Sequence, residues 1–179
     1  NGINAERRGL QQQMVDDADA LVDQVSLEQQ SQSSAWCFYD QNWHPGVVGL
    51  VASKLKERLH RPVIAFAPAD DGSDILRGSA RSIPGFHIRD ALADVDVKHP
   101  GLIERFGGHA MAAGLSLKKD CLEDFRIAFN DAAVSRLSEE LLQAECLSDG
   151  ELQSHEFSRE LAEDLRLAGP WGQGFPEPV

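Results

Sequence analysis

The chain has 179 residues, which suits one domain with short appendages, and its 42% of hydrophobic residues can bury a core. No apolar run approaches the length of a membrane-spanning helix. The three cysteines are far apart, which argues against a disulfide framework or a zinc site and favours a reducing cytoplasm. The formal net charge of −12 argues against general affinity for nucleic acid.

The charge is unevenly distributed along the chain. The segment from His44 to Ala110 carries nine Lys or Arg residues against eight Asp or Glu, whereas Lys118 to Arg166 carries six against thirteen. A local basic site is therefore compatible with an acidic protein, and it would bind a few phosphates rather than a long duplex.

Residues 4–25 are predicted to form one long helix. Apolar residues recur at helical spacing along one stripe, among them Leu10, Met14, Leu21 and Val25. A polar stretch at 29–34 follows and is typical of a linker. We therefore expect the helix to be a connector, with the compact domain starting after it.

Residues 35–67 predict a strand, a helix and a second strand. The first strand covers 35–39; Pro45 then suits the first turn of a helix that ends near Leu59; the second strand covers 62–67. The apolar stripe of the helix consists of Val47, Leu50, Val51 and Leu55. This order predicts a right-handed crossover between parallel strands.

A third strand is predicted at 74–83, and it carries the first candidate site. Alternate side chains of a strand share a face, so Arg77, Ser79 and Arg81 would lie together. Two guanidiniums flanking a hydroxyl suit a phosphate or a carboxylate. The alternative is a solvated strand face with its arginines paired to surface acids.

The second candidate site is the run Arg105-Phe106-Gly107-Gly108-His109. Adjacent glycines let a ligand approach the main chain closely, and the imidazole of His109 can donate to a phosphate or act as an acid or base. A plain Gly-Gly turn before a buried segment is the alternative, because short glycine motifs are weak signals.

The other expected elements are short. Helices are predicted at 86–93, 100–106, from Asp120 to Leu137, and at 158–167 with Ser158 as N-cap. Strands are predicted at 111–117 and as a pair within 141–152. The apolar face of the helix after Asp120 consists of Leu122, Phe125, Ile127, Phe129, Ala133 and Val134.

Together these segments resemble the DHH-associated domain of the RecJ family, bacterial exonucleases that degrade single-stranded DNA from the 5′ end. The resemblance rests on four ordered motifs: Trp43 to Gly49, Arg61 to Val63, Arg77 to Ser82 and Phe106 to Gly114. Residues 4–8 are similar to the start of the family's connecting helix, and 169–178 to the segment that enters its OB-fold domain.

The resemblance implies an α/β fold with a mixed central sheet flanked by helices, preceded by the long connecting helix. It implies that residues 1–28 connect to a catalytic DHH domain outside this chain, that 35–137 form the substrate-binding domain, and that 138–179 lead into an OB-fold domain. The first residue is Asn1 rather than Met, which agrees with a piece of a longer protein.

The resemblance also implies roles for the candidate residues. Ser79 and Arg81 would hold a 5′ or nearby backbone phosphate, and Arg77 would line the same face. Gly107, Gly108 and the catalytic candidate His109 would meet the scissile phosphate. His44, at a helix start, would meet an anion or simply cap the helix, and Trp43 would either stack on a base or lie in the core.

No cofactor is expected in this chain, because the family's two divalent metals, manganese or magnesium, bind to the DHH domain, and no Asp-His-His triplet occurs here. The acid pairs Asp16-Asp17 and Asp70-Asp71 are interpreted as a solvated helix face and a turn. Single-stranded DNA is the expected partner in the cytoplasm, with single-strand-binding protein and a recombination helicase as candidate protein partners and no membrane.

Two other functions stay open at this point. One is a DHH-family phosphoesterase that acts on short oligonucleotides or cyclic dinucleotides. The other is a non-catalytic tRNA- or nucleotide-binding module of the kind linked to alanyl-tRNA synthetases, which share the Gly-Gly-His motif. The tail from Gly169 and the connecting helix favour the exonuclease over the first alternative, and the combination of Trp43 to Gly46 with Arg77 to Ser82 favours it over the second.

Overall fold

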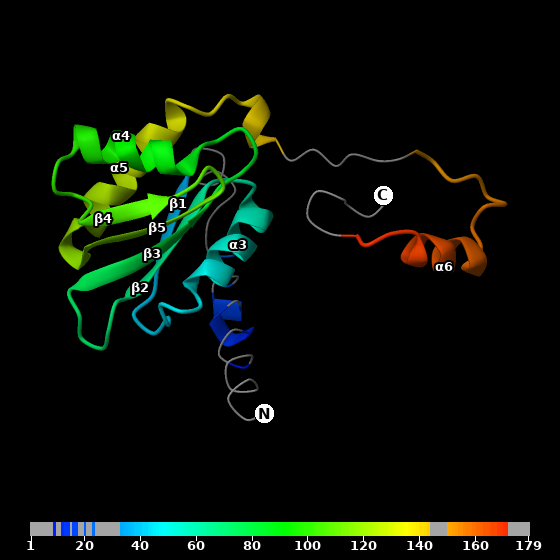
Figure 1. Cartoon of the computed structure of the whole chain (residues 1–179), viewed down its shortest axis with the longest axis horizontal. Coiled ribbons are helices and arrows are strands. Elements are labelled where there is room, and N and C mark those ends of the chain that lie inside the picture. The colour runs from blue at the N-terminus through cyan, green and yellow to red at the C-terminus, as the bar shows by residue number, and fades with distance from the viewer. Residues whose placement is uncertain are drawn as a thin grey trace. The chain divides into compact units, whose positions relative to one another are not determined.

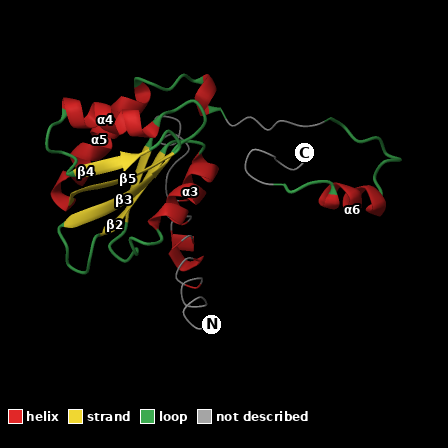
Figure 2. Ribbon diagram, in the orientation of Figure 1, coloured by secondary structure: helices red, strands yellow, loops and turns green. Residues whose placement is uncertain are grey.

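A computed structural model describes residues 9, 12–14, 16–17, 20, 23, 33–143 and 150–171 of the chain. The chain divides into two compact units, residues 1–143 and residues 144–179. The first unit contains a sheet with helices on both faces, and the described part of the second contains the helix α6 (Arg159–Leu167) (Figures 1 and 2).

The first unit is built around a five-stranded mixed sheet in the order β1-β2-β3-β5-β4. Its strands are β1 (Trp36–Tyr39), β2 (Val63–Pro68), β3 (Ile75–Arg81), β4 (Arg105–Gly108) and β5 (Ala112–Lys118). The unit also contains the helices α3 (Val48–Leu59), α4 (Ile88–Lys98) and α5 (Leu122–Val134), with 3₁₀ turns at Lys119–Cys121 and Glu140–Leu142. Strands β1 and β2 are parallel, as the predicted crossover requires, and the other neighbours are antiparallel.

Helices cover the two faces of the sheet unequally. Helices α4 and α5 pack on one face over a large apolar cluster that includes Phe66, Leu76 and Leu117 (Figure 1). Helix α3 packs on the other face, where Val51 and Leu55 meet Ala65. Among the described elements, helix α3 lies over β2 and β3, and its contacts do not extend in the same way to β4 and β5.

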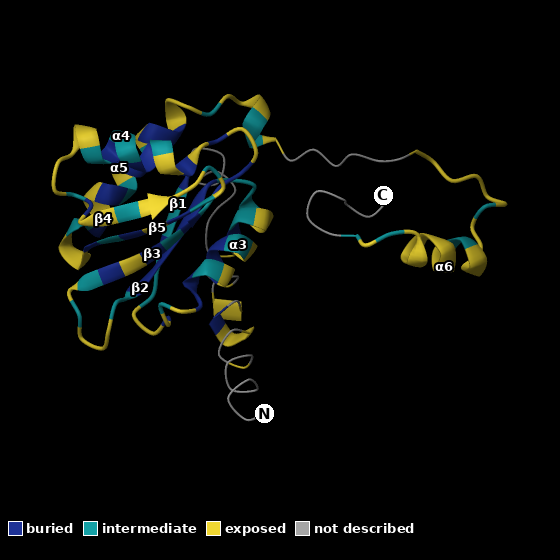
Figure 3. Cartoon of the chain, viewed as in Figure 1, coloured by how far each residue is buried: buried dark blue, intermediate teal, exposed yellow. Residues whose placement is uncertain are grey.

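Strand β3 confirms the predicted alternation of side chains. Leu76, Gly78 and Ala80 are buried, whereas Arg77 is exposed and Ser79 and Arg81 are half-buried (Figure 3). In a strand such alternation puts the polar residues on one face. That face is the one on which α3 lies, because Gly49 of α3 approaches both Arg81 and Ser79.

The register extends this polar face across β5 to β4. Arg77 pairs with Ser116, which pairs with Arg105. One step along, Ser79 pairs with Gly114, and Gly114 pairs with Gly107. Two rows of small or cationic residues therefore cross three neighbouring strands.

The start of α3 differs from the prediction. The helix begins at Val48, so Pro45 lies in the turn before it rather than in its first turn. Leu50, predicted to be buried, is 42% exposed. The buried face consists instead of Val48, Val51, Ala52 and Leu55.

The predicted helix at 100–106 is wrong. Gly101 has a φ of +85°, outside the helical region, and residues from Arg105 onward form β4 by pairing with β5. Helix α4 is longer than predicted and ends at Lys98. In α5, Ile127 and Val134 are 64% and 55% exposed, whereas Ala128 and Ala132 take buried positions.

The described residues between Gly9 and Asp23 are helical, and the remainder of the predicted helix at 4–25 lies outside the described residues. The side chain of Met14 is buried in the cluster under α3. Asp23 forms an ion pair with Arg58 of α3. These contacts attach this helix to the rest of the first unit.

Arg61, between α3 and β2, joins three segments of the first unit. Its guanidinium donates to the backbone carbonyls of Ser33 at 3.4 Å, His60 at 2.9 Å and Leu142 at 2.5 Å. Burial lowers the pKa of this guanidinium from its ordinary value. Arg61 thereby holds the entry and the end of this unit to the end of α3.

In the second unit Ser158 is the predicted N-cap of α6, since its hydroxyl accepts from the amide of Leu161 at 3.0 Å. The strand pair predicted within 141–152 is absent from its described part, where Leu141 and Leu142 belong to a 3₁₀ turn, and 144–149 lie outside the described residues. Of the predicted segment 169–178, residues after Trp171 also lie outside them. Among the helices described, none is long and apolar enough to cross a bilayer.

Candidate functional site

The guanidinium of Arg81 is the centre of the predicted site on β3. It donates through Nη1 to the hydroxyl of Ser79 at 2.9 Å and to the carbonyl of Ala80 at 2.9 Å. It donates through Nε to the hydroxyl of Ser53 on α3 at 3.2 Å. These contacts fix the plane of the guanidinium over the sheet.

Helix α3 approaches this guanidinium through a glycine. A Cβ built on Gly49 would lie 2.8 Å from Nη2 of Arg81 and 3.2 Å from Oγ of Ser79, so a side chain here would displace the arginine. One turn later, the hydroxyl of Ser53 donates to the carbonyl of Gly49 at 3.0 Å while it accepts from Arg81. Gly49 and Ser53 together form the helix wall of the site.

The charge of Arg81 has no direct acidic partner among the residues that the structure describes, and the same holds for Arg77 and Arg105. Burial lowers the pKa of the Arg81 guanidinium, since a buried cation loses hydration. An arginine nevertheless stays protonated at neutral pH. A half-buried cation without a carboxylate is suited to an anionic ligand.

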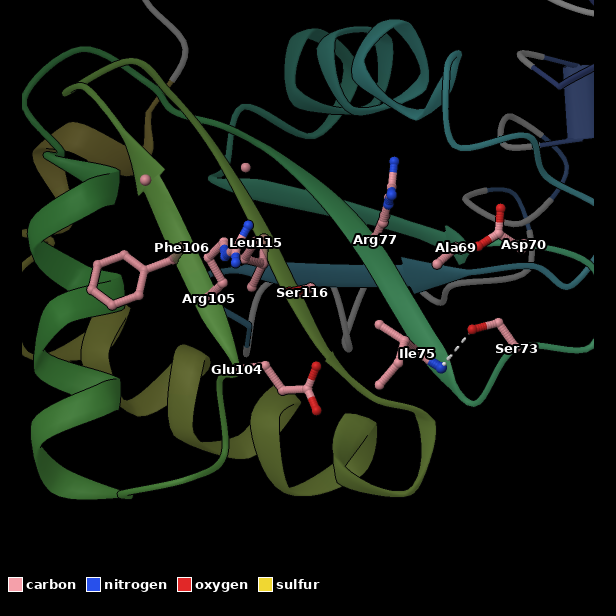
Figure 4. A pocket seen from close by; sticks show the side chains of 12 residues that line it. Ala69, Asp70, Ser73, Ile75, Arg77, Glu104, Arg105, Phe106, Leu115 and Ser116 are labelled. Atoms are coloured by element: carbon pink, nitrogen blue, oxygen red, sulfur yellow. Dashed lines mark hydrogen bonds between the residues drawn. The ribbon is translucent and has the colours of Figure 1, made fainter.

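Beside this arginine the open face of the sheet forms a hollow of about 810 Å³. Figure 4 shows its cationic side chains Arg77 on β3 and Arg105 on β4, with Ser116 of β5 between them. Its floor includes Gly107 and Gly114, and the carboxylates of Asp70 and Glu104 also line it. The hollow is therefore open, polar and of mixed charge.

Arg77 also lines a second hollow, of about 740 Å³, together with His44, Asn42 and Asp71. The Nδ1 atom of His44 accepts from the amide of Gly46 at 3.0 Å, so the imidazole caps the turn before α3. The indole of Trp43 is 3% exposed and packs in the core under α3. Burial contradicts the reading of Trp43 as a stacking platform and supports its alternative as a core residue.

The two adjacent glycines of β4 have different environments. Gly108 has a φ of +146°, and a Cβ built on it would lie 2.4 Å from the carbonyl oxygen of Ala112. Gly107 has no such conformation, and a Cβ there would have no heavy atom within 4 Å. Gly108 is thus required by the hairpin between β4 and β5, whereas Gly107 faces open space.

His109 lies directly after β4 and is exposed. Its backbone amide donates to the carbonyl of Ala112 at 2.8 Å, and Ala112 is the residue of β5 that pairs with Arg81. The backbone of the hairpin therefore brings His109 to the end of the sheet at which Arg81 lies. Among the described residues, no hydrogen bond links the side chain of His109 to Arg77 or Ser79, and His109 lines neither the hollow beside Arg105 nor the one beside His44.

The structure adds residues that the sequence did not single out. Ser53 lies four residues after Gly49, a spacing that puts both on one helix face and that could have revealed it. Arg105 and Ser116 share a face with Gly107, but the mistaken helix at 100–106 concealed that alternation. Among the described residues, no group of three or more His, Cys, Asp or Glu side chains is arranged to hold a metal ion, so the chain's own described residues do not fit one.

Comparisons with known proteins identify relatives along the whole chain. The single-stranded-DNA-specific exonuclease RecJ of Dickeya dadantii is 50% identical over 179 residues, which are all of this chain and 31% of that protein. The Escherichia coli protein of the same name is 47% identical over the same share of each. The chain thus spans about a third of the length of these relatives.

Among solved structures, the crystal structure of RecJ in complex with Mg²⁺ from Thermus thermophilus superposes with a TM-score of 0.73 at 28% identity. The match covers 98% of this chain and 25% of that one. The DHHA1 domain family matches residues 16–135. This range contains the whole sheet and the candidate residues on β3, on β4 and at the start of α3. The chain belongs to the DHHA1 domain family, and along its whole length it is similar to the RecJ exonucleases.

Proposed function

We propose that this chain is the substrate-binding part of a 5′-to-3′ exonuclease for single-stranded DNA, used in DNA repair and recombination. The observation that supports this most strongly is the arrangement at Arg81. Its guanidinium is half-buried, oriented by the hydroxyls of Ser79 and Ser53, and has no carboxylate partner among the described residues. The relatives that carry the name RecJ act, by that name, on single-stranded DNA.

In this proposal Arg81 and Ser79 bind the terminal 5′ phosphate of the strand. The Nε and Nη1 donors of Arg81 already bond to Ser53, Ser79 and Ala80, so the two N–H groups of Nη2 donate to the phosphate. The serine hydroxyl adds a third donor when it rotates toward the ligand. Burial of the arginine strengthens the attraction, because water screens it less than at an exposed position. The outcome is a fixed position for the end of the strand.

In this proposal Gly107, Gly108 and His109 serve the scissile phosphate, and Arg77 lines the face on which Ser79 and Arg81 hold the terminal one. Gly107 leaves room for a ligand close to the backbone, since nothing lies within 4 Å of where its Cβ would be. Gly108 shapes the hairpin that presents His109, and the imidazole of His109 holds or moves a proton at the scissile phosphate. His44 contributes to the same surface through the hollow that it shares with Arg77.

In this proposal a separate DHH domain carries out hydrolysis and would hold divalent manganese or magnesium. In support, two solved RecJ structures similar to this chain are complexes with Mg²⁺ and with Mn²⁺. Such a metal activates water and stabilises charge on the phosphoryl group. This chain would bind and orient the strand and would not cleave it alone. Incubation of the chain with end-labelled single strands and manganese should release no nucleotides, and steady release of mononucleotides would contradict this division.

A cytoplasmic setting, with single-strand-binding protein and a recombination helicase as partners, belongs to the same proposal. Its support is chemical: Cys37 and Cys121 are free thiols, as expected in a reducing compartment. Pull-down of either purified partner by the chain would test the contact, and capture of neither would contradict it.

The test of the proposed function is a binding panel read by fluorescence anisotropy at low salt. The ligands are a single strand with a 5′ phosphate, the same strand with a 5′ hydroxyl, one with a 3′ phosphate, and a blunt duplex. We expect the tightest binding for the 5′-phosphorylated single strand. The control variant is Arg89→Ala on α4, across the sheet from the site, and it should bind like the parent. Equal binding of all four ligands would contradict the proposal.

A further inference from the structure

We infer that the hollow on the open sheet face is a second phosphate subsite, in which Arg105 and Arg77 hold an internal phosphodiester of the strand across Ser116. The inference rests on the proposed function, since it assumes that the strand's terminal phosphate lies at Arg81 and Ser79. It assigns a binding role to Arg105, Ser116 and Gly114.

The register of the sheet brings the two guanidiniums together. Arg77 of β3 and Arg105 of β4 both pair with Ser116 of β5, so they flank it on one face. Neighbouring strands are about 4.8 Å apart, which separates the two arginine backbones by roughly 10 Å. Their side chains are long enough to reach one anion over the hydroxyl of Ser116, and all three residues line the hollow in Figure 4.

The floor of the hollow is built to let a ligand lie on the sheet. Gly107 and Gly114 pair with each other and sit one step from the arginine row. A Cβ on Gly107 would contact nothing within 4 Å, and one on Gly114 would reach only the carbonyl oxygen of Gly78 at 3.9 Å. Neither position needs glycine for its own packing, so the space above them is free for a ligand.

The spacing of the rows suits successive groups of one strand. Along a strand, residues on one face recur about every 6.7 Å. The arginine row at Arg77 is therefore roughly 7 Å from Ser79 and roughly 13 Å from Arg81 at the backbone. A strand anchored at Arg81 would cross the glycine floor and then meet the guanidiniums of Arg77 and Arg105.

The carboxylates in the hollow limit how strongly it attracts an anion. Asp70 and Glu104 line it, but among the described residues neither forms an ion pair with Arg77 or Arg105. The guanidiniums are thus free to bind a phosphate. Removal of one carboxylate, in Glu104→Gln, should tighten binding of a long strand, because the like charge that opposes the phosphate is gone.

The experiment uses 5′-phosphorylated oligothymidylates of one to four nucleotides and the variants Arg105→Gln and Gly114→Ala, with Arg89→Gln as control. Binding is followed through the backbone amide resonances of the labelled chain, so that weak ligands are measurable. Both test variants should bind the tetranucleotide about tenfold more weakly, and Arg105→Gln should bind the mononucleotide as the parent does. The slope of log K against log salt for the tetranucleotide should become shallower by about 0.7 in Arg105→Gln.

Two results would overturn the inference. Arg105→Gln that binds every length like the parent would show a solvated arginine, and equal losses for every length would show a general effect on the fold. The parent's preference for a 5′ phosphate reports separately on the proposed function. If that preference is missing while Arg105→Gln still weakens the tetranucleotide, the hollow binds phosphodiesters and only the terminal site is wrong. A parent that binds no oligonucleotide overturns both.

Discussion

Arg81 and Ser79 are neighbours on one face of β3, and the guanidinium of the first donates to the hydroxyl of the second at 2.9 Å. The contact keeps both groups in place before any ligand arrives. Preorganisation of this kind reduces the entropy lost on binding. The consequences of this relationship, and of the packing around it, can be tested by substitution.

The glycine in α3 that faces this pair should be required for binding but not for stability. In Gly49→Ala the new methyl group meets the far end of Arg81, which can move aside. We expect the free energy of unfolding to stay constant or rise by up to about 1 kcal/mol, because alanine is the better helix former. Affinity for a 5′-phosphorylated strand should fall several-fold in the same protein.

Thermal unfolding and anisotropy measured side by side would check this. Leu50→Ala, at an exposed position of the same helix, is the matched control and should leave binding unchanged. Unimpaired binding by Gly49→Ala would mean that the position of the guanidinium does not matter.

The adjacent glycines of β4 should behave in opposite ways. Gly108→Ala forces a side chain into a left-handed conformation and against the carbonyl of Ala112, and should cost at least about 2 kcal/mol of unfolding free energy. Gly107→Ala projects into open space and should change stability by less than about 0.5 kcal/mol. Urea unfolding of both variants tests the contrast, and equal destabilisation would refute the assignment of Gly108 to the hairpin.

The clamp formed by Arg61 should contribute measurably to stability. Arg61→Ala leaves the carbonyls of Ser33 and Leu142 without their guanidinium donor, and we expect a loss of about 2 kcal/mol. Arg61→Lys should rescue little, because a single ammonium cannot reproduce the fork of donors. Chemical unfolding of the two variants provides the measurement, and full rescue by lysine would show that charge alone matters.

The thiol of Cys37 should make stability fall at alkaline pH. Burial raises the pKa of this thiol well above its ordinary value of 9.0. The folded chain therefore keeps the proton while the unfolded chain loses it, so the contribution of this thiol to stability is constant well below pH 9 and falls above it. The slope from this group approaches about 1.4 kcal/mol per pH unit.

Unfolding free energies of the parent and of Cys37→Ala between pH 8 and pH 10.5 isolate this contribution. The difference between the two proteins should be constant up to about pH 9 and should then change in favour of the variant. A difference that does not depend on pH would show that the thiol ionises equally in both states.

The residue pattern within single segments of the sequence predicted the alternating faces of β3 and the parallel pairing of β1 with β2. The alternation around Arg77 to Arg81 predicted which side chains share a face of β3, and the structure confirms it. The strand-helix-strand order before it predicted the parallel pair β1 and β2. Each of these signals is contained in one continuous segment of the sequence.

Other features depended on contacts between distant segments. Arg105 was placed in a helix because its strand exists only through pairing with β5. Ile127 was expected to be buried because α5 is apolar on several sides, and only the packing against the sheet decides which side is covered. The contact of Ser53 with Arg81 needs the crossing of α3 over β3, which no local pattern contains.

The measurement that tests the central claim most directly is a thermodynamic cycle between Arg81 and the 5′ phosphate. Anisotropy titrations give the affinities of the parent and of Arg81→Ala for the same strand with a 5′ phosphate and with a 5′ hydroxyl. We predict that the parent prefers the phosphate, that the variant has no preference, and that the coupling energy is about 1.5–3 kcal/mol. The same preference in both proteins would show that Arg81 does not bind the terminal phosphate.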